Sequence, residues 1–385
     1  MSQASGTPGK PKVAWIAVEP TPFHMPLFEF IRNSAQVDIR YYFCSQQIDQ
    51  PWDLDRYAHL IEPESNRRSY RLGGLYFNPA ILGALRGNAW DAVVVSGYAH
   101  WTMQASILWC LARGVPFLLQ SDTHLLKPRG WLKRALKRAF LFPVLRQSSA
   151  ALGLGRLQRE YFLSIGIPPE RLFTVPLTSH LDQFMAAVRD CRAKRGELRQ
   201  QWGIPEDATV AVFVGRLVPE KALDVLLEGL ALVEPGHRPH LLLVGDGEER
   251  SRLEQIAVER QLPVTFAGFQ QNHDLPAMFA AGDFFVLPSR REAWGLVVAE
   301  AMASGLPVVL SDQVGAAYDL LEEGRNGFLV PAAGGARSWA EALRRCLDQP
   351  DLLAEMGRQS LERIGSWTCA AAGAEFVRAI RYVLG

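Results

Sequence analysis

The chain has 385 residues, of which 48% are hydrophobic and 21% charged, and this balance is that of an ordinary soluble globular protein. Its length favours two or three domains, each large enough to bury a core. The five cysteines are scattered, without a C-x-x-C pair. They argue against a disulfide scaffold or a zinc site and favour a reducing compartment.

The net charge of +1 conceals an uneven distribution. Residues 1–180 carry 20 Lys and Arg against 12 Asp and Glu, a net of +8, whereas residues 181–385 carry 21 against 28, a net of −7. Such an imbalance fits two domains, of which the basic one faces an anionic partner. Nucleic acid and an acidic membrane surface both meet that description, and an imbalance without any function is an equal alternative.

No targeting or membrane-spanning segment is expected. The first 12 residues are polar and lack the apolar core of a signal peptide. The chain also contains no run of 18 or more uncharged apolar residues. We therefore expect a protein that works in the cytoplasm.

The first half alternates short apolar strands with helices. We expect strands at residues 12–18, 37–44, 92–96, 115–120, 150–154 and 173–176. One helix is expected to begin at about Pro26, because a proline suits the first turn of a helix. Another helix is expected to end at Arg113. Residues 45–78 are polar, contain prolines and give no clear assignment. The alternation predicts parallel βαβ units, in which functional residues gather in loops after the carboxyl ends of the strands.

Residues 127–146 combine a basic cluster with an apolar stripe at helical spacing. The basic side chains are Lys127, Arg129, Lys133, Arg134, Lys137 and Arg138, and the stripe is Trp131, Leu132, Leu136 and Phe140. One interpretation is an amphipathic helix that makes peripheral contact with an anionic membrane. The other is a domain helix that buries its leucines and phenylalanine while its charges meet water. The pattern leaves both open.

The second half repeats the alternation after a break. Residues 181–208 are interpreted as a linker region, a charged helix followed by a turn. Strands are then expected at residues 211–215, 241–245, 264–269, 283–287 and 307–310, and the first two are near-identical apolar runs that each end in glycine. We therefore predict a second wound α/β half, with the cleft between the halves as the default ligand site.

Two glutamates mark the strand–turn–helix–strand segment at residues 288–310. Glu292 lies at the turn and Glu300 inside the predicted helix. Paired carboxylates suggest a glycosidase, but those carboxyl groups lie roughly 5 to 9.5 Å apart. Eight helical residues would span about 12 Å at 1.5 Å per residue. The pair is therefore better suited to hold two ends of a long ligand, while either glutamate alone is more often a capping or solvated carboxylate.

A diphosphate site is indicated after the strand at residues 211–215. Gly215 allows the backbone to come close to a ligand, and a helix start offers free N–H groups. Arg216 and Lys221 add two cations five residues apart. Pairing of these cations with Glu220 and Glu228 is an equal alternative.

Two further strand ends give weaker signals. Gly245 begins a glycine-rich turn that lacks the lysine of a P-loop. Gly268 and Phe269 end a strand suited to a flat base resting on the backbone. The chain has no Asp-x-Asp pair near a strand end and no cluster of His or Cys ligands, so we expect no metal ion in the chemistry.

These motifs, in this order, resemble one enzyme family. They are GRLVPEK (215–221), LLLVGDGEER (241–250), VTFAGF (264–269), PSRREAWGLVVAEAMASGLPVV (288–309) and GRNGFLV (324–330). As a set they resemble the family 4 glycosyltransferases, of the retaining GT-B type with an E-x7-E motif. The resemblance is strong over roughly residues 200–370 and looser over residues 1–180.

The resemblance implies an α/β architecture of two Rossmann-like domains that face a central cleft. Residues 1–180 would form the amino-terminal, acceptor-side domain, and residues 209–368 the domain that binds the nucleotide-sugar donor. The last helix, 369–384, would cross back to the first domain. Neither a cofactor nor a nucleic-acid partner is implied, because the nucleotide sugar is itself a substrate.

The resemblance also implies roles for individual residues. Arg216 and Lys221 would neutralise the donor's diphosphate, Glu300 would hold the ribose hydroxyls and Glu292 hydroxyls of the donor sugar. The backbone of Ala293, Trp294, Gly295 and Leu296 would meet the diphosphate at the helix start. The leaving diphosphate itself would take the acceptor's proton, so stabilising its charge would be the main catalytic task.

The first domain departs from the family pattern. Many members carry a Gly-Gly pair in the first loop, where this chain has Pro20 to His24. Members also tend to have a histidine after a middle strand, close to the donor sugar. We favour Asp122, which directly follows its strand, as the polar group of this domain. His24 and His100 are the next candidates.

The sequence thus predicts a retaining, metal-independent glycosyltransferase. It would move a hexose from a UDP- or GDP-sugar to a hydroxyl acceptor in cell-envelope, polysaccharide or glycolipid assembly. The acceptor could be a glycan, a lipid-linked glycan or a small molecule. Two alternatives are another GT-B sugar-nucleotide enzyme, such as an epimerase or a phosphorylase, and a non-catalytic nucleotide-sugar-binding protein.

Overall fold

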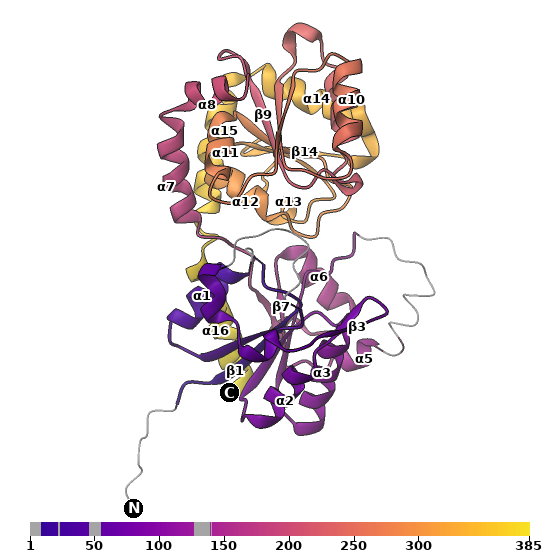
Figure 1. The fold of residues 1–385 in the computed structure, drawn as a ribbon, viewed down its shortest axis with the longest axis vertical. Coiled ribbons are helices and arrows are strands. Elements are labelled where there is room, and N and C mark those ends of the chain that lie inside the picture. Colours follow the sequence, from indigo (N-terminus) through magenta and orange to yellow (C-terminus); the bar gives the residue numbers. More distant parts are fainter. Residues whose placement is uncertain (1–8, 22–23, 46–54, 127–138, 140) are drawn as a thin grey trace, which may run out of the picture. The chain divides into compact units, whose positions relative to one another are not determined.

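The computed structural model describes residues 9–21, 24–45, 55–126, 139 and 141–385 (Figure 1). The chain divides into two compact units. Unit 1 comprises residues 1–179 with 369–385, and unit 2 comprises residues 180–368. The predicted basic helix at 127–146 falls largely outside the described residues.

Unit 1 is built on a six-stranded parallel sheet with the order β2-β1-β5-β6-β7-β8. Its strands are β1 (Lys12–Ala17), β2 (Asp38–Phe43), β5 (Ala92–Ser96), β6 (Phe117–Ser121), β7 (Ala150–Gly153) and β8 (Leu172–Thr174). Its helices are α1 (Met25–Asn33), α2 (Pro79–Gly87), α3 (Trp101–Arg113), α5 (Phe142–Leu145), α6 (Arg156–Ser164) and α16 (Cys369–Leu384). The predicted strands are therefore confirmed, with ends that differ by at most two residues.

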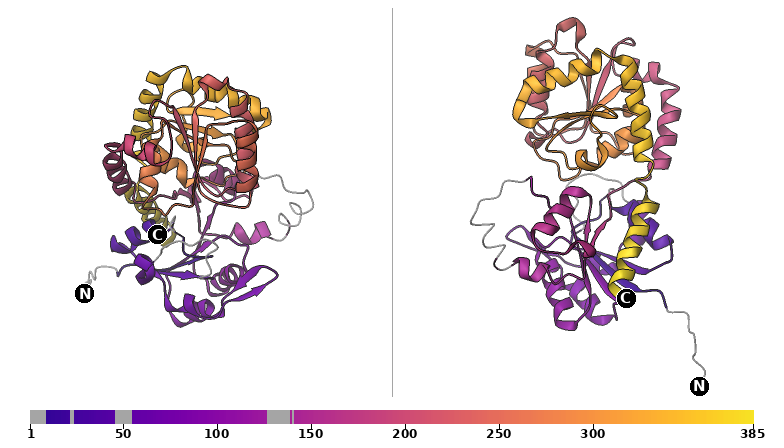
Figure 2. Two further views of the ribbon diagram at one scale, coloured as in Figure 1. Left: turned by 45° about the horizontal axis from the view of Figure 1, so that its top comes forward. Right: turned by 180° about the vertical axis from the view of Figure 1, so that it is seen from behind.

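Alternation along β1 shows how this sheet buries both of its faces. Val13 and Trp15 belong to one hydrophobic core, whereas Ala14 and Ile16 belong to the other, because successive strand residues point to opposite faces. The first core also takes Phe376 of α16. This last helix runs along unit 1, as the view from behind shows (Figure 2, right).

Residues 55–78, which the sequence left unassigned, form short elements. They are the 3-10 helices η1 (Asp55–Leu60) and η2 (Pro63–Asn66) and an antiparallel hairpin of β3 (Tyr70–Leu72) and β4 (Leu75–Phe77). The hairpin turns at Gly73 and Gly74, both with positive φ, a conformation that glycine adopts at little cost.

Unit 2 repeats the plan with a parallel sheet of order β11-β10-β9-β12-β13-β14. Its strands are β9 (Val210–Val214), β10 (His240–Val244), β11 (Val264–Gly268), β12 (Phe284–Leu287), β13 (Val308–Ser311) and β14 (Gly327–Val330). Its helices are α7 (Leu181–Arg192), α8 (Arg195–Gln201), α9 (Leu223–Ala231), α10 (Arg250–Glu259), α11 (Leu275–Ala281), α12 (Leu296–Ala303), α13 (Ala317–Leu320), α14 (Gly335–Leu347) and α15 (Pro350–Ile364). The predicted α/β class with two Rossmann-like halves is confirmed.

The segment interpreted as a linker, 181–208, forms α7 and α8 and belongs to unit 2. Arg199 of α8 is buried and donates to the carbonyl of Ala281 at 3.1 Å and to the carboxylate of Asp283 at 2.8 Å. Asp283 also accepts the amide of Val210 at 2.8 Å. These bonds fasten α8 to the amino ends of β9 and β12.

No helix among the described residues is both long enough and apolar enough to cross a membrane. The five cysteines are free thiols, as their scattered positions predict. Burial raises the pKa of the Cys44, Cys110 and Cys346 thiols to about 12, so these three stay protonated at neutral pH.

Candidate functional site

The carboxyl ends of three neighbouring strands of unit 2 are fastened together by backbone hydrogen bonds. Gly215, which follows β9, donates to the carbonyl of Val244 at 2.9 Å, and Gly245, which follows β10, donates to Gly268 at 2.8 Å. These are the glycines that the sequence predicted at strand ends. A parallel sheet exposes its ligand-binding loops at this edge.

Gly245 is needed because the backbone of the next strand end lies against it. A Cβ at this position would stand 1.9 Å from the carbonyl oxygen of Gly215, and its φ of +136° disfavours any other residue. The close approach therefore joins two turns of the protein. This gives Gly245 a structural reason beyond the ligand contact that the sequence suggested.

We expect Gly245→Ala to destabilise the protein by about 3 kcal/mol or more, because the clash is with backbone and cannot relax by a side-chain rotation. Gly236→Ala is the matched control, since a Cβ there meets nothing within 4 Å. The control should stay within about 0.5 kcal/mol of wild type. Equal midpoints of denaturant unfolding for the two variants would contradict the packing argument.

A pocket of about 310 Å³ opens beside these turns. Its lining is Arg216, Val218, Glu220, Lys221, Glu248, Arg291 and Glu292. Three cations and three carboxylates thus share one small volume, and four of the seven residues come from the GRLVPEK motif. The structure brings together the predicted residues Arg216, Lys221 and Glu292.

Lys221 and Glu292 form an ion pair in this pocket. Both side chains are largely buried, with 17% and 19% of their surfaces exposed. Lys221 closes the 3-10 turn η5 (Pro219–Lys221), and α9 begins only at Leu223 because Ala222 is left-handed, with φ 53°. The lysine therefore lies just before α9.

Arg290 and Arg291 tie the two turns that carry this ion pair. The Arg290 guanidinium donates to the carbonyl of Pro219 at 2.8 Å and to both carboxylate oxygens of Asp224 at 3.1 Å. Arg291 reaches Glu220 at 3.1 Å. Neither arginine was predicted from sequence as a positioning residue. Their position directly before Glu292 is the sequence feature that could have identified them.

The turn before α12 is held by tight packing. Gly295 adopts φ +94°, and a Cβ there would lie 3.2 Å from Cγ of Glu292. Trp294 is 2% exposed, and its ring stacks on Trp367 at 5.5 Å between centroids. Because its side chain packs inside the protein, only the backbone of Trp294 is available to a ligand. Leu296, which is also buried, begins α12.

Ala293 and Glu292 lie on a loop fixed to the neighbouring turn. The Glu292 amide donates to Gln313 and its carbonyl accepts the amide of Gly315, each at 3.1 Å. A Cβ on Gly315 would come within 2.2 Å of the Ala293 carbonyl oxygen. The backbone of this predicted donor-binding loop is therefore held from both sides.

Glu300 lies inside α12, half-buried. Burial raises the pKa of its carboxyl group from the ordinary value of 4.5 to about 7, because desolvation disfavours the charged form. Phe269, which directly follows β11, exposes 37% of its surface. A carboxyl group poised near neutrality is a frequent mark of a functional site.

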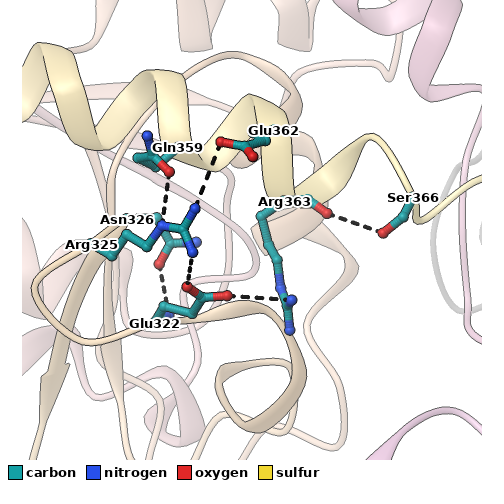
Figure 3. A pocket seen from close by; sticks show the side chains of 7 residues that line it. All are labelled: Glu322, Arg325, Asn326, Gln359, Glu362, Arg363 and Ser366. Atoms are coloured by element: carbon teal, nitrogen blue, oxygen red, sulfur yellow. Dashed lines mark hydrogen bonds and ion pairs between the residues drawn. The ribbon is translucent and has the colours of Figure 1, made fainter.

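A second cavity, of about 180 Å³, lies beside α15 and the residues that precede β14 (Figure 3). Arg325 bonds to Glu322 and to Gln359, each at 2.8 Å, and Arg363 lies 3.3 Å from Glu322. Its charged side chains point toward one another in Figure 3. The residues there stabilise the loop of the GRNGFLV motif, and we assign no ligand to them.

In unit 1 the structure brings His24 and Asp122 within electrostatic range. Burial lowers the pKa of His24 to about 4, and the nearby Asp122 carboxylate opposes that shift. The Nδ1 atom of His24 lies 2.8 Å from the hydroxyl of Thr21. His24 is therefore neutral at physiological pH.

His100 has a different environment. It directly precedes α3, its Nδ1 atom accepts the amide of Tyr76 at 3.1 Å, and its ring stacks on Tyr76. Burial lowers its pKa. These contacts give His100 a structural role, and its catalytic role stays a prediction. Among the described residues no group of three or more His, Cys, Asp and Glu side chains is arranged to hold a metal ion.

Two family models match the chain. One, described as "Glycosyl transferases group 1", matches residues 194–363, and the other, "Glycosyl transferase 4-like domain", matches residues 44–178. The first covers every element of the pocket in unit 2. The second covers most of the first sheet.

Curated relatives are similar over part of their length. An alpha-D-kanosaminyltransferase of Streptomyces kanamyceticus is 33% identical over 219 residues, 56% of this chain and 55% of the relative. A D-inositol 3-phosphate glycosyltransferase 2 of Catenulispora acidiphila is 34% identical over 239 residues, 56% and 54% of the two chains. The chain therefore spans about half the length of the curated relatives it matches.

Solved structures share the fold across nearly the whole chain. Anabaena HepE in complex with UDP and glucose has a TM-score of 0.73 at 19% identity, covering 96% of this chain and 99% of that one. The glycosyltransferase WaaG, involved in lipopolysaccharide biosynthesis, has a TM-score of 0.67 at 19% identity with the same coverage. At this identity the likeness identifies the GT-B fold alone.

Proposed function

We propose that this chain, which belongs to the group 1 glycosyltransferases with a family 4-like amino-terminal domain, transfers a sugar from a nucleoside-diphosphate sugar to a hydroxyl acceptor with retention of configuration. The observation that carries the proposal is the pocket of unit 2, where Arg216, Lys221 and Glu292 meet at the carboxyl ends of the strands. Its cations suit a diphosphate, and its carboxylates suit hydroxyl groups.

The diphosphate is the ligand that best fits Arg216 and Lys221. In the free protein Lys221 is paired with Glu292, so an incoming diphosphate would replace one anionic partner of the lysine by another. Glu292 is then free to accept hydrogen bonds from the donor sugar. The exchange keeps a counter-charge beside Lys221 at each stage, so the lysine is never left desolvated and unpaired.

Glu300 is proposed to hold the ribose. Two vicinal hydroxyl groups are donors, and a carboxylate can accept both. Gly268 and Phe269 would support the base, and the amides of the turn from Ala293 to Leu296 would face the diphosphate. The donor would thus lie along the ends of the strands of unit 2.

In the proposed reaction the bond between the anomeric carbon and the diphosphate oxygen breaks with its electron pair on that oxygen. The acceptor oxygen bonds to the anomeric carbon on the face that the diphosphate leaves, and its proton passes to the diphosphate. Arg216 and Lys221 would stabilise the charge that develops on the leaving group. We propose that they do so without a metal ion. Asp122, His24 and His100 remain our candidates for acceptor-side groups.

The proposed substrates are based on the names of the similar proteins. The kanosaminyl and inositol-phosphate enzymes are named as sugar transferases, and the HepE structure contains UDP and glucose. We therefore propose a UDP- or GDP-hexose as donor and a glycan, lipid-linked glycan or small molecule as acceptor, in cell-envelope, polysaccharide or glycolipid assembly. The free cysteines lead us to place the reaction in the cytoplasm.

A panel of nucleotides and nucleotide sugars, screened by thermal shift with EDTA present, tests the donor assignment. Nucleoside diphosphates and one or more of their sugars should raise the unfolding temperature, whereas the nucleosides and inorganic phosphate should not. The best donor is then incubated without acceptor. Epimerisation of the donor in the absence of acceptor would mean that the protein is an epimerase and not a transferase. If no compound of the panel raised the unfolding temperature, the proposed donor binding would be refuted.

The pKa of Glu300 predicts proton release when UDP binds. At pH 6.5 the free protein holds Glu300 mostly protonated, since its pKa is about 7, and ribose hydroxyls favour the carboxylate. The same raised pKa means that this group makes folding less favourable as pH rises through 7. Calorimetry in buffers of different ionisation enthalpy should therefore detect more proton release for wild type than for Glu300→Gln. Equal release would remove Glu300 from the ribose site.

A further inference from the structure

Trp367 lies in the short turn that follows α15. Its amide donates to the carbonyl of Ile364, the last residue of that helix, at 2.8 Å, and α16 begins at Cys369. The Trp367 side chain is half-buried, and the residue still belongs to unit 2. The sequence motifs of the donor site end at Val330, so they give Trp367 no role.

The ring of Trp367 stacks on the ring of Trp294, in the loop between Glu292 and α12. The ring centroids lie 5.5 Å apart and the ring planes meet at 12°. Nearly parallel rings at this separation form an offset stack, an arrangement that aromatic pairs prefer. Because Trp294 is also only 2% exposed, its ring has little freedom to take another position.

Trp294 is the side chain by which this loop is held. Its neighbours Ala293 and Gly295 carry only a methyl group and no side chain, respectively. The carbonyl of Trp294 accepts the amide of Ala316 at 2.8 Å, which fixes the backbone on one side. The ring of Trp294 provides the second attachment, and the position of that ring depends on Trp367.

Helix α15 packs on α12 and contacts the turn at its carboxyl end. A Cβ on Gly357 of α15 would stand 2.2 Å from the carbonyl oxygen of Gly305, and a Cβ on Gly305 would lie 3.2 Å from Cδ1 of Leu361. The backbone of α15 is thus in direct contact with the turn that ends α12. Together, α15 and the Trp367 that follows it support both ends of the helix that carries Glu300.

We propose that Trp367 is a positioning residue of the donor site, which acts through the ring of Trp294 on the loop of Glu292. This inference rests on the proposed function, in which Glu292 holds the donor sugar. UDP lacks that sugar, and Arg216 and Lys221, which follow a different strand, would still bind its diphosphate. Loss of the stack should therefore slow transfer far more than it weakens UDP binding.

Hydrogen exchange measures the hold on the loop without any ligand. The amides of Glu292 and Ala316 bond across this loop, to the carbonyls of Gln313 and Trp294. In Trp367→Ala these two amides should exchange about fivefold faster or more, while the amides of β9 and β10 keep their wild-type rates. A purely structural loss would instead speed exchange throughout unit 2.

Calorimetry with UDP, and initial rates with the nucleotide sugar selected by the thermal-shift panel, measure the effect on the reaction. In Trp367→Ala we expect kcat to fall about 30-fold or more, since a misplacement of about 1 Å can cost about 100-fold. The Kd for UDP should rise less than about threefold, because the diphosphate contacts remain. Trp367→Phe keeps a ring that can stack and should restore kcat to within about threefold of wild type.

Trp202→Ala is the matched control, because it removes another half-buried indole of unit 2, at the end of α8. It should leave loop exchange and kcat as in wild type. Trp367→Leu keeps apolar bulk without stacking and should behave as Trp367→Ala does, so it serves where the alanine variant does not fold. Wild-type loop exchange or wild-type kcat in these Trp367 variants would overturn the proposal. So would a failure of phenylalanine to restore kcat, or an equal loss of kcat in Trp202→Ala.

Failure of this proposal is distinguishable from failure of the proposed function. If the wild-type protein neither binds UDP nor transfers sugar, the proposed function fails, and hydrogen exchange still decides whether Trp367 holds the loop. If the wild-type protein transfers sugar and Trp367→Ala does so at the same rate, only the positioning role fails.

Discussion

Replacing Lys221 by methionine is expected to weaken UDP binding by about 100-fold, because a charge-assisted hydrogen bond is worth about 1.5 to 3 kcal/mol. Turnover should fall further, by about 100- to 1,000-fold, since the lost cation acts on charge that develops in the transition state. Lys194→Met is the matched control, because this lysine of unit 2 is exposed. Calorimetry with UDP and initial rates measure the two effects. Unchanged affinity would overturn the assignment of Lys221 to the diphosphate.

A second substitution, at Glu292, tests the same assignment more closely, because Glu292 is the partner of Lys221 in the free protein. In Lys221→Met the Glu292 carboxylate loses that partner and would repel a diphosphate. The loss of UDP affinity caused by Lys221→Met should therefore be smaller in a Glu292→Gln background. Glu292→Gln alone should keep UDP binding and lose turnover, since UDP lacks the sugar that Glu292 is proposed to hold. A Glu292→Gln enzyme with the wild-type rate would remove Glu292 from the site.

Replacing Asp283 by alanine is expected to destabilise the protein by about 3 kcal/mol, since breaking a buried ion pair from one side leaves the other charge uncompensated. Asp283 accepts from Arg199 and from the Val210 amide, each at 2.8 Å, and from Arg195 at 2.5 Å. The Arg199 side chain is only 6% exposed. Denaturant unfolding with constant cooperativity gives the free energy of unfolding.

Glu254→Ala is the matched control for Asp283→Ala. Glu254 also pairs with an arginine at 2.8 Å, Arg250, but its side chain is 43% exposed. Exposed helical pairs contribute only about 0.3 to 0.5 kcal/mol. Similar losses for both variants would mean that burial does not distinguish the two ion pairs, contrary to this account.

The strands could be predicted from sequence because their apolar runs are short and bounded by polar or glycine residues. VAVFV of β9 and HLLLV of β10 are fully buried, as expected for parallel strands covered on both faces. Their ends then located Gly215 and Gly245. The local sequence pattern was sufficient to predict an element where the spacing of its buried residues matched the spacing typical of that element.

The ties around the pocket could not be predicted in the same way. Arg290 contacts Pro219 and Asp224, which lie more than 60 residues earlier in the chain. No local pattern distinguishes such an arginine from a solvated one. Gly245 is a similar case: its own φ of +136° already favours glycine, but the close approach of the Gly215 carbonyl could not be read from the local sequence.

The β3–β4 hairpin escaped prediction for a different reason. Tyr70, Arg71 and Leu72 are all exposed, so the strand shows no alternation between buried and exposed residues. Without a buried face there is no period of two to detect.

The most direct test of sugar transfer uses a donor labelled in its sugar, with a cell extract of glycans and lipids as acceptors. We expect label to move to an acceptor as nucleoside diphosphate is released, one for one, and both to stop in Glu292→Gln. Label that stays on the nucleotide, or that appears only as free or epimerised sugar while the donor still binds, would contradict it.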